Sequence, residues 1–136
     1  MTKEEIQTKY KELILPENKA PYHFEKVEGA TEVKAYNPMC GDKYTLYIKD
    51  EGIIHFHGIG CAISKASTSF MLKAIEGKTR DEMIAFSKAF IKAIDEDGNF
   101  DNFPEGLKVL GELKQHEGRV DCIQLSWKAL LAHLEI

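Results

Sequence analysis

NPMCGD at residues 37–42 and GIGCAISKASTS at residues 58–69 enclose two segments in which polar and apolar residues alternate. Both motifs contain glycine, which adopts backbone conformations closed to other residues and so permits tight chain reversals. After the second motif the apolar period lengthens from two to about 3.6 residues, as in a helix. The pattern predicts strands that lead into a helix at Cys61, with Cys40 and Asp42 flanking the first reversal.

Three strands are predicted, over residues 31–37, 43–49 and 53–58. In the second strand apolar side chains alternate with more polar ones, as expected where one face of a sheet is packed and the other is wetter. The packed face would present Tyr44, Leu46 and Ile48, and the wetter face Lys43, Thr45, Tyr47 and Lys49. Asp50-Glu51-Gly52 supplies a hairpin turn, so the sheet is expected to be antiparallel.

Helical periodicity predicts elements on both sides of this sheet. A first helix is expected over residues 2–15, capped by Thr2 with Glu5, and Pro16 is expected to end it. Further helices are expected over residues 62–76, 79–95 and 120–134, with a short one within 105–116. Strands followed by helices indicate one α+β domain over residues 1–136.

Composition excludes several classes of function. The net charge is −4 and the basic residues are scattered, which argues against a nucleic-acid partner. No apolar run approaches the roughly 20 residues that a membrane span needs, and the N-terminal residues are too polar and acidic for a signal peptide. We therefore expect a cytoplasmic protein without a membrane partner. An odd number of cysteines, three, in such a chain favours free thiols or metal ligands over a disulfide framework.

The cysteines fall at the ends of predicted elements. Cys40 and Asp42 share one turn, Cys61 precedes a helix and Cys122 opens another. Three thiols and one carboxylate in such places form a plausible four-ligand site for a thiophilic metal. The chain contains no CxxC pair, so the spacing leaves open that these cysteines are small buried apolar residues.

Two histidines compete for the fourth ligand position. His55 and His57 lie two apart on a predicted strand, hence on one face, a few residues before Cys61. The other histidines have no motif around them and are interpreted as surface residues: His23, His116 and His133. Ser64, Ser67 and Ser69 lack a Gly-x-Ser-x-Gly elbow and a neighbouring base, so they are interpreted as helix residues that bond nearby carbonyls.

Four segments in order carry a family resemblance: residues 37–42, residues 60–67, Gly77-Lys78 and residues 119–130. They resemble the iron–sulfur cluster assembly family of IscU, SufU and the NifU N-terminal domain, over about residues 32–131. The chain is most similar to the SufU branch, because 60 residues separate Cys61 from Cys122. Asp121 stands where IscU proteins carry a histidine, and HEGRV at residues 116–120 replaces their LPPVK motif. This difference argues against a chaperone partnership of the IscU type.

The resemblance implies a SufE/NifU-like fold, with a three-stranded antiparallel sheet packed against about five helices. It also implies a metal site of Cys40, Asp42, Cys61 and Cys122, with zinc as in SufU. Arg119 matches a SufU-like arginine and would balance the negative charge of the site. The carboxylate is a hard ligand among soft thiolates, which suits a site that must open.

The leading functional hypothesis is a sulfur acceptor with sulfurtransferase-like activity. It would take persulfide sulfur from a SufS-like cysteine desulfurase and pass it to downstream iron–sulfur assembly proteins, with Cys40, Cys61 and Cys122 as candidate acceptors. The first alternative is a scaffold on which a transient [2Fe–2S] cluster is assembled at the same residues and then transferred. The second is a structural zinc module.

Overall fold

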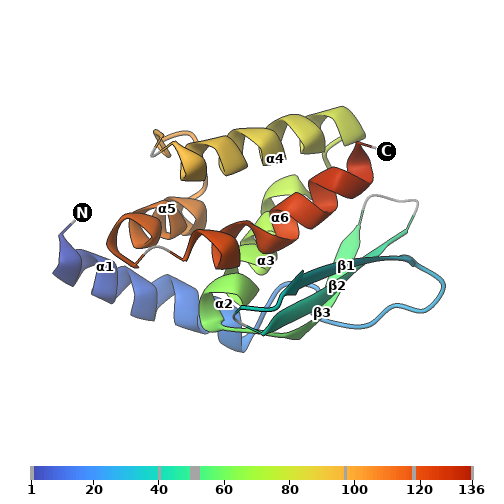
Figure 1. Cartoon of the computed structure of the whole chain (residues 1–136), viewed down its shortest axis with the longest axis horizontal. Helices are drawn as coiled ribbons and strands as arrows, with labels where there is room; N and C mark the ends of the chain where they lie inside the picture. The colour runs from blue at the N-terminus through green and yellow to red at the C-terminus, as the bar shows by residue number, and fades with distance from the viewer. Residues whose placement is uncertain (1, 40, 50–52, 97, 118, 136) are drawn as a thin grey trace.

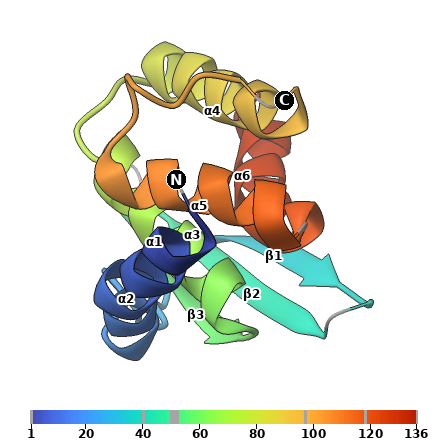
Figure 2. The same cartoon turned by 90° about the vertical axis from the view of Figure 1, so that its left-hand side faces the viewer.

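The computed structural model describes residues 2–39, 41–49, 53–96, 98–117 and 119–135. A three-stranded antiparallel sheet in the order β1-β2-β3 forms one side of the molecule. The helices α3 and α6 contact the sheet, and α4 packs on their far side (Figure 1). Figure 2 shows α1 beside α5, and in Figure 1 α1 lies at the opposite side of the molecule from β1. The predicted α+β class, with a small antiparallel sheet and about five helices, is confirmed.

The sheet places Asp42 at one of its ends. Its strands are β1 (Thr31–Asn37), β2 (Asp42–Ile48) and β3 (Ile54–Ile59). Asn37 is paired with Asp42 and Lys43 with Ile59, so the first residue of β2 lies where β3 ends. The chain leaves β3 at this point and reaches Cys61 two residues later.

The alternation predicted for β2 is only partly correct. Tyr44 and Leu46 are buried as predicted, but Tyr47, expected on the wetter face, is only 8% exposed. Its register partner His55 contacts Glu25 from the loop before β1, so that loop reaches this part of the sheet. The predicted hairpin turn at residues 50–52 lies outside the described residues.

The N-terminal helix does not end at Pro16 as predicted. It runs from α1 (Lys3–Lys9) through a π-helical turn (η1, Tyr10–Ile14) into α2 (Leu15–Lys19). In this turn the Leu15 N–H donates to the carbonyl of Tyr10, five residues earlier. A proline inside an α-helix removes one donor and crowds the carbonyl four residues before it, and the wider turn relieves that crowding.

The remaining helices are α3 (Ala62–Ile75), α4 (Arg80–Asp95), α5 (Glu105–Glu117) and α6 (Val120–Leu134). Trp127 of α6 is fully buried and packs against Phe90 of α4 in a tilted ring contact, with ring centroids 4.3 Å apart. Packing of this kind fixes α6, and therefore its first turn, relative to the rest of the core. Among the described helices, none is both long and apolar enough to cross a membrane.

The predicted capping box of α4 is present and supports a stability prediction. The Thr79 hydroxyl accepts from the Glu82 N–H at 3.2 Å, and the Thr79 N–H donates to the Glu82 carboxylate at 2.9 Å. Thr79→Ala should lower the free energy of unfolding by about 1 kcal/mol, measured by urea denaturation. Thr8→Ala, at an exposed position inside the first helix, is the control and should be nearly neutral. Equal losses in the two variants would contradict a capping role.

Candidate metal centre

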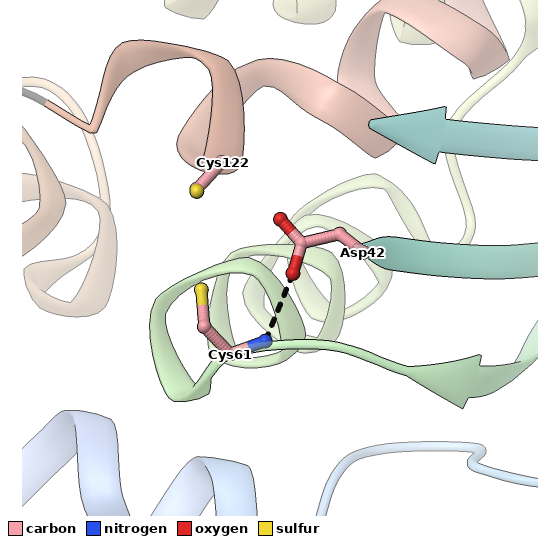
Figure 3. Close-up of side chains that lie close together, drawn as sticks. All are labelled: Asp42, Cys61 and Cys122. Carbon is pink, nitrogen blue, oxygen red and sulfur yellow. Dashed lines mark hydrogen bonds between the residues drawn. The ribbon is translucent and has the colours of Figure 1, made fainter. Parts of the chain in front are cut away.

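Three of the four predicted ligands converge in space. Asp42 begins β2, Cys61 precedes α3 and Cys122 lies in the first turn of α6. One ligand atom of each lies within 4.8 Å of the others, and Figure 3 shows the three side chains pointing toward one another. Cys40 lies outside the described residues. The structure therefore brings together residues that are up to 80 positions apart in the chain, since 122 − 42 = 80.

The two oxygens of Asp42 have different surroundings. Asp42 is fully buried, and its Oδ1 accepts the Cys61 N–H at 2.9 Å. Its Oδ2 is also buried but has no hydrogen-bond partner in the described part of the chain. A buried carboxylate oxygen without a partner is costly, and a bound cation removes that cost. The unpartnered oxygen beside two sulfurs is thus what a divalent thiophilic metal such as zinc requires, and the residues present fit it.

Cys61 is the N-cap of α3. Its backbone is extended, with φ −72° and ψ 165°, and its Sγ accepts the Ser64 N–H at 3.4 Å. Cys61 is partly exposed, whereas Cys122 is only 2% exposed. The two sulfurs therefore differ in their access to solvent.

Sequence reasoning missed the contribution of Tyr44 and Ser64. The Tyr44 hydroxyl lies 2.8 Å from Ser64 Oγ, and both side chains are about 1% exposed. Burial raises the pKa of Tyr44 above its ordinary value, and the acidic groups of the site add to this rise, while the Ser64 hydrogen bond opposes it. Tyr44 therefore stays a neutral hydroxyl at physiological pH. Two signals existed: the position of Tyr44 two residues after Asp42, on the same strand face, and that of Ser64 at the third position of a capped helix.

Gly60 allows these groups to approach one another. A Cβ atom on Gly60 would fall against the Tyr44 hydroxyl, 2.7 Å from Asp42 Oδ1 and 2.8 Å from Ser64 Oγ. Such distances are well inside normal contact, so only glycine leaves room here. The residue before the cysteine is thus part of the architecture of the site.

The other candidates lie elsewhere or remain predictions. His55 pairs with Glu25 at 3.2 Å and His57 stacks on Phe24, so neither joins the cluster found among the described residues. His23, expected at the surface, is partly buried and its Nε2 lies 2.9 Å from Glu76. Arg119 is exposed at the N-cap of α6, with a left-handed backbone at φ 55°. Its charge-balancing role stays a prediction.

The chain matches a known protein family over most of its length. Residues 9–134 match the family model described as the NifU-like N-terminal domain. The chain is 33% identical over 130 residues to the zinc-dependent sulfurtransferase SufU of Bacillus subtilis, covering 92% of this chain and 88% of that protein. It is 34% identical over 131 residues to the iron–sulfur cluster assembly scaffold protein IscU of Streptococcus pyogenes, covering 89% and 79% respectively.

A solved structure shows the same arrangement of elements. It is the crystal structure of a putative iron–sulfur cluster assembly scaffold protein for the SUF system, from Fervidobacterium islandicum. The two chains superpose with a TM-score of 0.80 and 32% sequence identity, covering 98% of this chain and 99% of the other. A match of this extent includes both the sheet and the helices that position Asp42, Cys61 and Cys122.

Proposed function

Because the chain belongs to the NifU-like N-terminal domain family, the iron–sulfur cluster assembly family of SufU and IscU, we propose that it is a zinc-binding sulfur acceptor for cluster assembly. The observation that carries this proposal is the convergence of Asp42, Cys61 and Cys122 around a buried carboxylate oxygen without a partner. The name of the B. subtilis relative, a zinc-dependent sulfurtransferase, supports zinc and sulfur transfer together.

In this proposal zinc is held by Cys40, Asp42, Cys61 and Cys122. When bound, the metal would keep the cysteines as thiolates at neutral pH. The metal site would carry a net charge of −2, because its three thiolates and one carboxylate bring four negative charges and the divalent ion brings two positive ones. We assign the balancing charge to Arg119, which lines one shallow cavity with Cys122.

The sulfur transfer itself is a thiol–disulfide type exchange. A cysteine thiolate of this chain attacks the outer sulfur of the persulfide carried by a SufS-like cysteine desulfurase. A new S–S bond forms on this chain and the S–S bond on the desulfurase breaks, which leaves a thiolate there. No external oxidant or reductant is needed. The persulfide then passes to downstream iron–sulfur assembly proteins.

The test is to add the zinc-loaded protein to a cysteine desulfurase and cysteine, and to follow alanine release. We expect strong stimulation, because removal of the persulfide sulfur frees the desulfurase for another turnover. Cys40→Ser, Cys61→Ser and Cys122→Ser should each abolish it, whereas Thr8→Ala, far from the three ligands in sequence, should not. Stimulation that persists in all three cysteine variants would overturn the proposal.

A second candidate is a scaffold for a [2Fe–2S] cluster, which would be cargo at the same four residues. The name of the S. pyogenes relative favours it. Absence of alanine stimulation, together with a stable cluster absorption spectrum after addition of iron and sulfide, would support this function. If neither occurs and zinc removal unfolds the protein, a structural zinc module is the better description.

A further inference from the structure

Ser64 contacts Cys61 through both its backbone and its side chain. The Ser64 N–H donates to Cys61 Sγ at 3.4 Å, and the Ser64 hydroxyl donates to the Cys61 carbonyl at 3.1 Å. The same hydroxyl oxygen lies 3.6 Å from Cys61 Sγ. One residue therefore controls both the sulfur and the backbone of this cysteine.

Tyr44 in turn fixes the Ser64 hydroxyl. The two oxygens are 2.8 Å apart in a buried setting, and the phenol carries a single hydrogen that it can donate to Ser64. Because Gly60 has no Cβ, the pair lies directly against the chain that leads into Cys61. With the oxygen of Ser64 occupied by Tyr44 as acceptor, its own hydrogen is available to Cys61.

The Ser64 hydroxyl lies within reach of two atoms of Cys61. Without a metal, the Cys61 S–H can donate to Ser64 Oγ, while the Ser64 hydroxyl donates to the Cys61 carbonyl. A metal-bound Cys61 is a thiolate with no hydrogen to donate, and the Ser64 hydroxyl can then turn to the sulfur while still accepting from Tyr44. The thiolate would then receive two hydrogen bonds from Ser64, one from N–H and one from O–H. Donors of this kind orient a metal ligand and hold it in place.

We propose that Ser64, held by Tyr44, is the positioning residue that makes Cys61 the retained ligand of the metal centre. Ligand exchange during sulfur relay then takes place at Cys40 or Cys122. This division of labour rests on the proposed zinc site and sulfur acceptor function. It assigns to Cys61 the task of keeping the metal, and to one of the other cysteines the task of accepting sulfur.

The first test is zinc release from the loaded full-length protein into an excess of a chromogenic chelator, without a desulfurase. Ser64→Ala should release zinc about tenfold faster than the wild type, because the thiolate loses its side-chain donor. Tyr44→Phe, which removes only the phenol oxygen, should accelerate release less. It also tests the proposal if Ser64→Ala fails to fold.

Ser67→Ala is the matched control. Ser67 is also a 1% exposed serine of α3, but its hydroxyl bonds to the Ile123 carbonyl and to Trp127 instead of Cys61. The control should lose stability yet release zinc at the wild-type rate. If zinc release is equally faster in Ser64→Ala and Ser67→Ala, the cause is a general destabilisation of α3 and the proposal is overturned. A wild-type rate of zinc release in Ser64→Ala would also overturn it.

A second readout follows the cysteine itself. The zinc-loaded protein is treated with an alkylating reagent, and the rate of modification of Cys61 is read by mass spectrometry. Cys61 is more exposed than Cys122, so its own rate is compared between variants: it should react more slowly in the wild type than in Ser64→Ala, and equal rates in the two proteins would overturn the proposal. If the protein stimulates alanine release by the desulfurase but Ser64→Ala releases zinc at the wild-type rate, the role of Ser64 is wrong and the sulfur acceptor function stands. If Ser64→Ala releases zinc faster but the wild-type protein does not stimulate alanine release, the sulfur acceptor function is wrong and the role of Ser64 stands.

Discussion

Replacing Gly60 with alanine is expected to abolish metal binding at the proposed zinc site. The new methyl group would be forced against the Tyr44 hydroxyl, Asp42 Oδ1 and Ser64 Oγ, so the surroundings of residue 60 must shift. Asp42 Oδ1 holds the Cys61 N–H, and its displacement separates the carboxylate from the sulfur. Overpacking of this kind costs about 1–3 kcal/mol of folding free energy. The measurements are zinc affinity by chelator competition and urea denaturation of the metal-free protein.

Gly29→Ala separates this steric effect from the general cost of losing a glycine. Gly29 has φ +77°, and a Cβ atom there would meet nothing within 4 Å. The variant should lose about 1 kcal/mol from left-handed backbone strain and bind zinc normally. Wild-type zinc affinity in Gly60→Ala would show that the site adapts to the methyl group, and would contradict the close packing described around Gly60.

Asp42→Asn is expected to stabilise the metal-free protein while weakening zinc binding. The asparagine Oδ1 can still accept the Cys61 N–H, and the amide nitrogen would replace the unpartnered Oδ2 beside two sulfurs. Removing a buried charged acceptor that lacks a partner should raise the free energy of unfolding by about 1–3 kcal/mol. The substitution removes an anionic metal ligand. Loss of a group that only hydrogen-bonds a metal ligand already lowers metal affinity by up to about 100-fold, so zinc affinity should fall by at least this factor.

Asp42→Ala provides the comparison for the hydrogen bond. It removes the ligand oxygen and also leaves the Cys61 N–H without its acceptor. The metal-free alanine variant should therefore be less stable than the asparagine variant, although both bind zinc weakly. Both free energies are measured by urea denaturation in the presence of a reductant and a chelator. If the asparagine variant is less stable than the wild type, the carboxylate is not a source of strain in the metal-free protein.

Much of the architecture was predictable because local signals agreed with the packing. The capping box of Thr79 with Glu82 and the helix start after Cys61 are visible in the sequence, and the structure confirms both. The continuation of the first helix past Pro16 was not predictable, because a π-helical turn has no simple sequence signature. The burial of Tyr47 escaped prediction because alternation along one strand does not show which distant segments pack on each face of the sheet.

The sequence pointed to the three side chains that the structure brings together, Asp42, Cys61 and Cys122, but not to the network around them. Cysteines and an aspartate at the ends of predicted elements suggested a metal site, while their spacing alone left open that the cysteines are small buried apolar residues. By contrast, the Tyr44–Ser64 pair joins a strand to a helix 20 residues later and has meaning only once the two elements are packed. The lack of space around Gly60 likewise depends on three side chains from two other elements. The sequence does not show that these side chains lie close to this glycine.

The order of the ligands along the chain has a consequence for how the protein unfolds. Asp42 and Cys122 are separated by 122 − 42 = 80 positions, so a metal bound by both closes a long covalent loop, much as a cross-link would. Closing such a loop reduces the conformational entropy available to the denatured chain. Loss of the metal would therefore remove this constraint, and would bring the separation of α6 from the sheet closer in free energy to the native state.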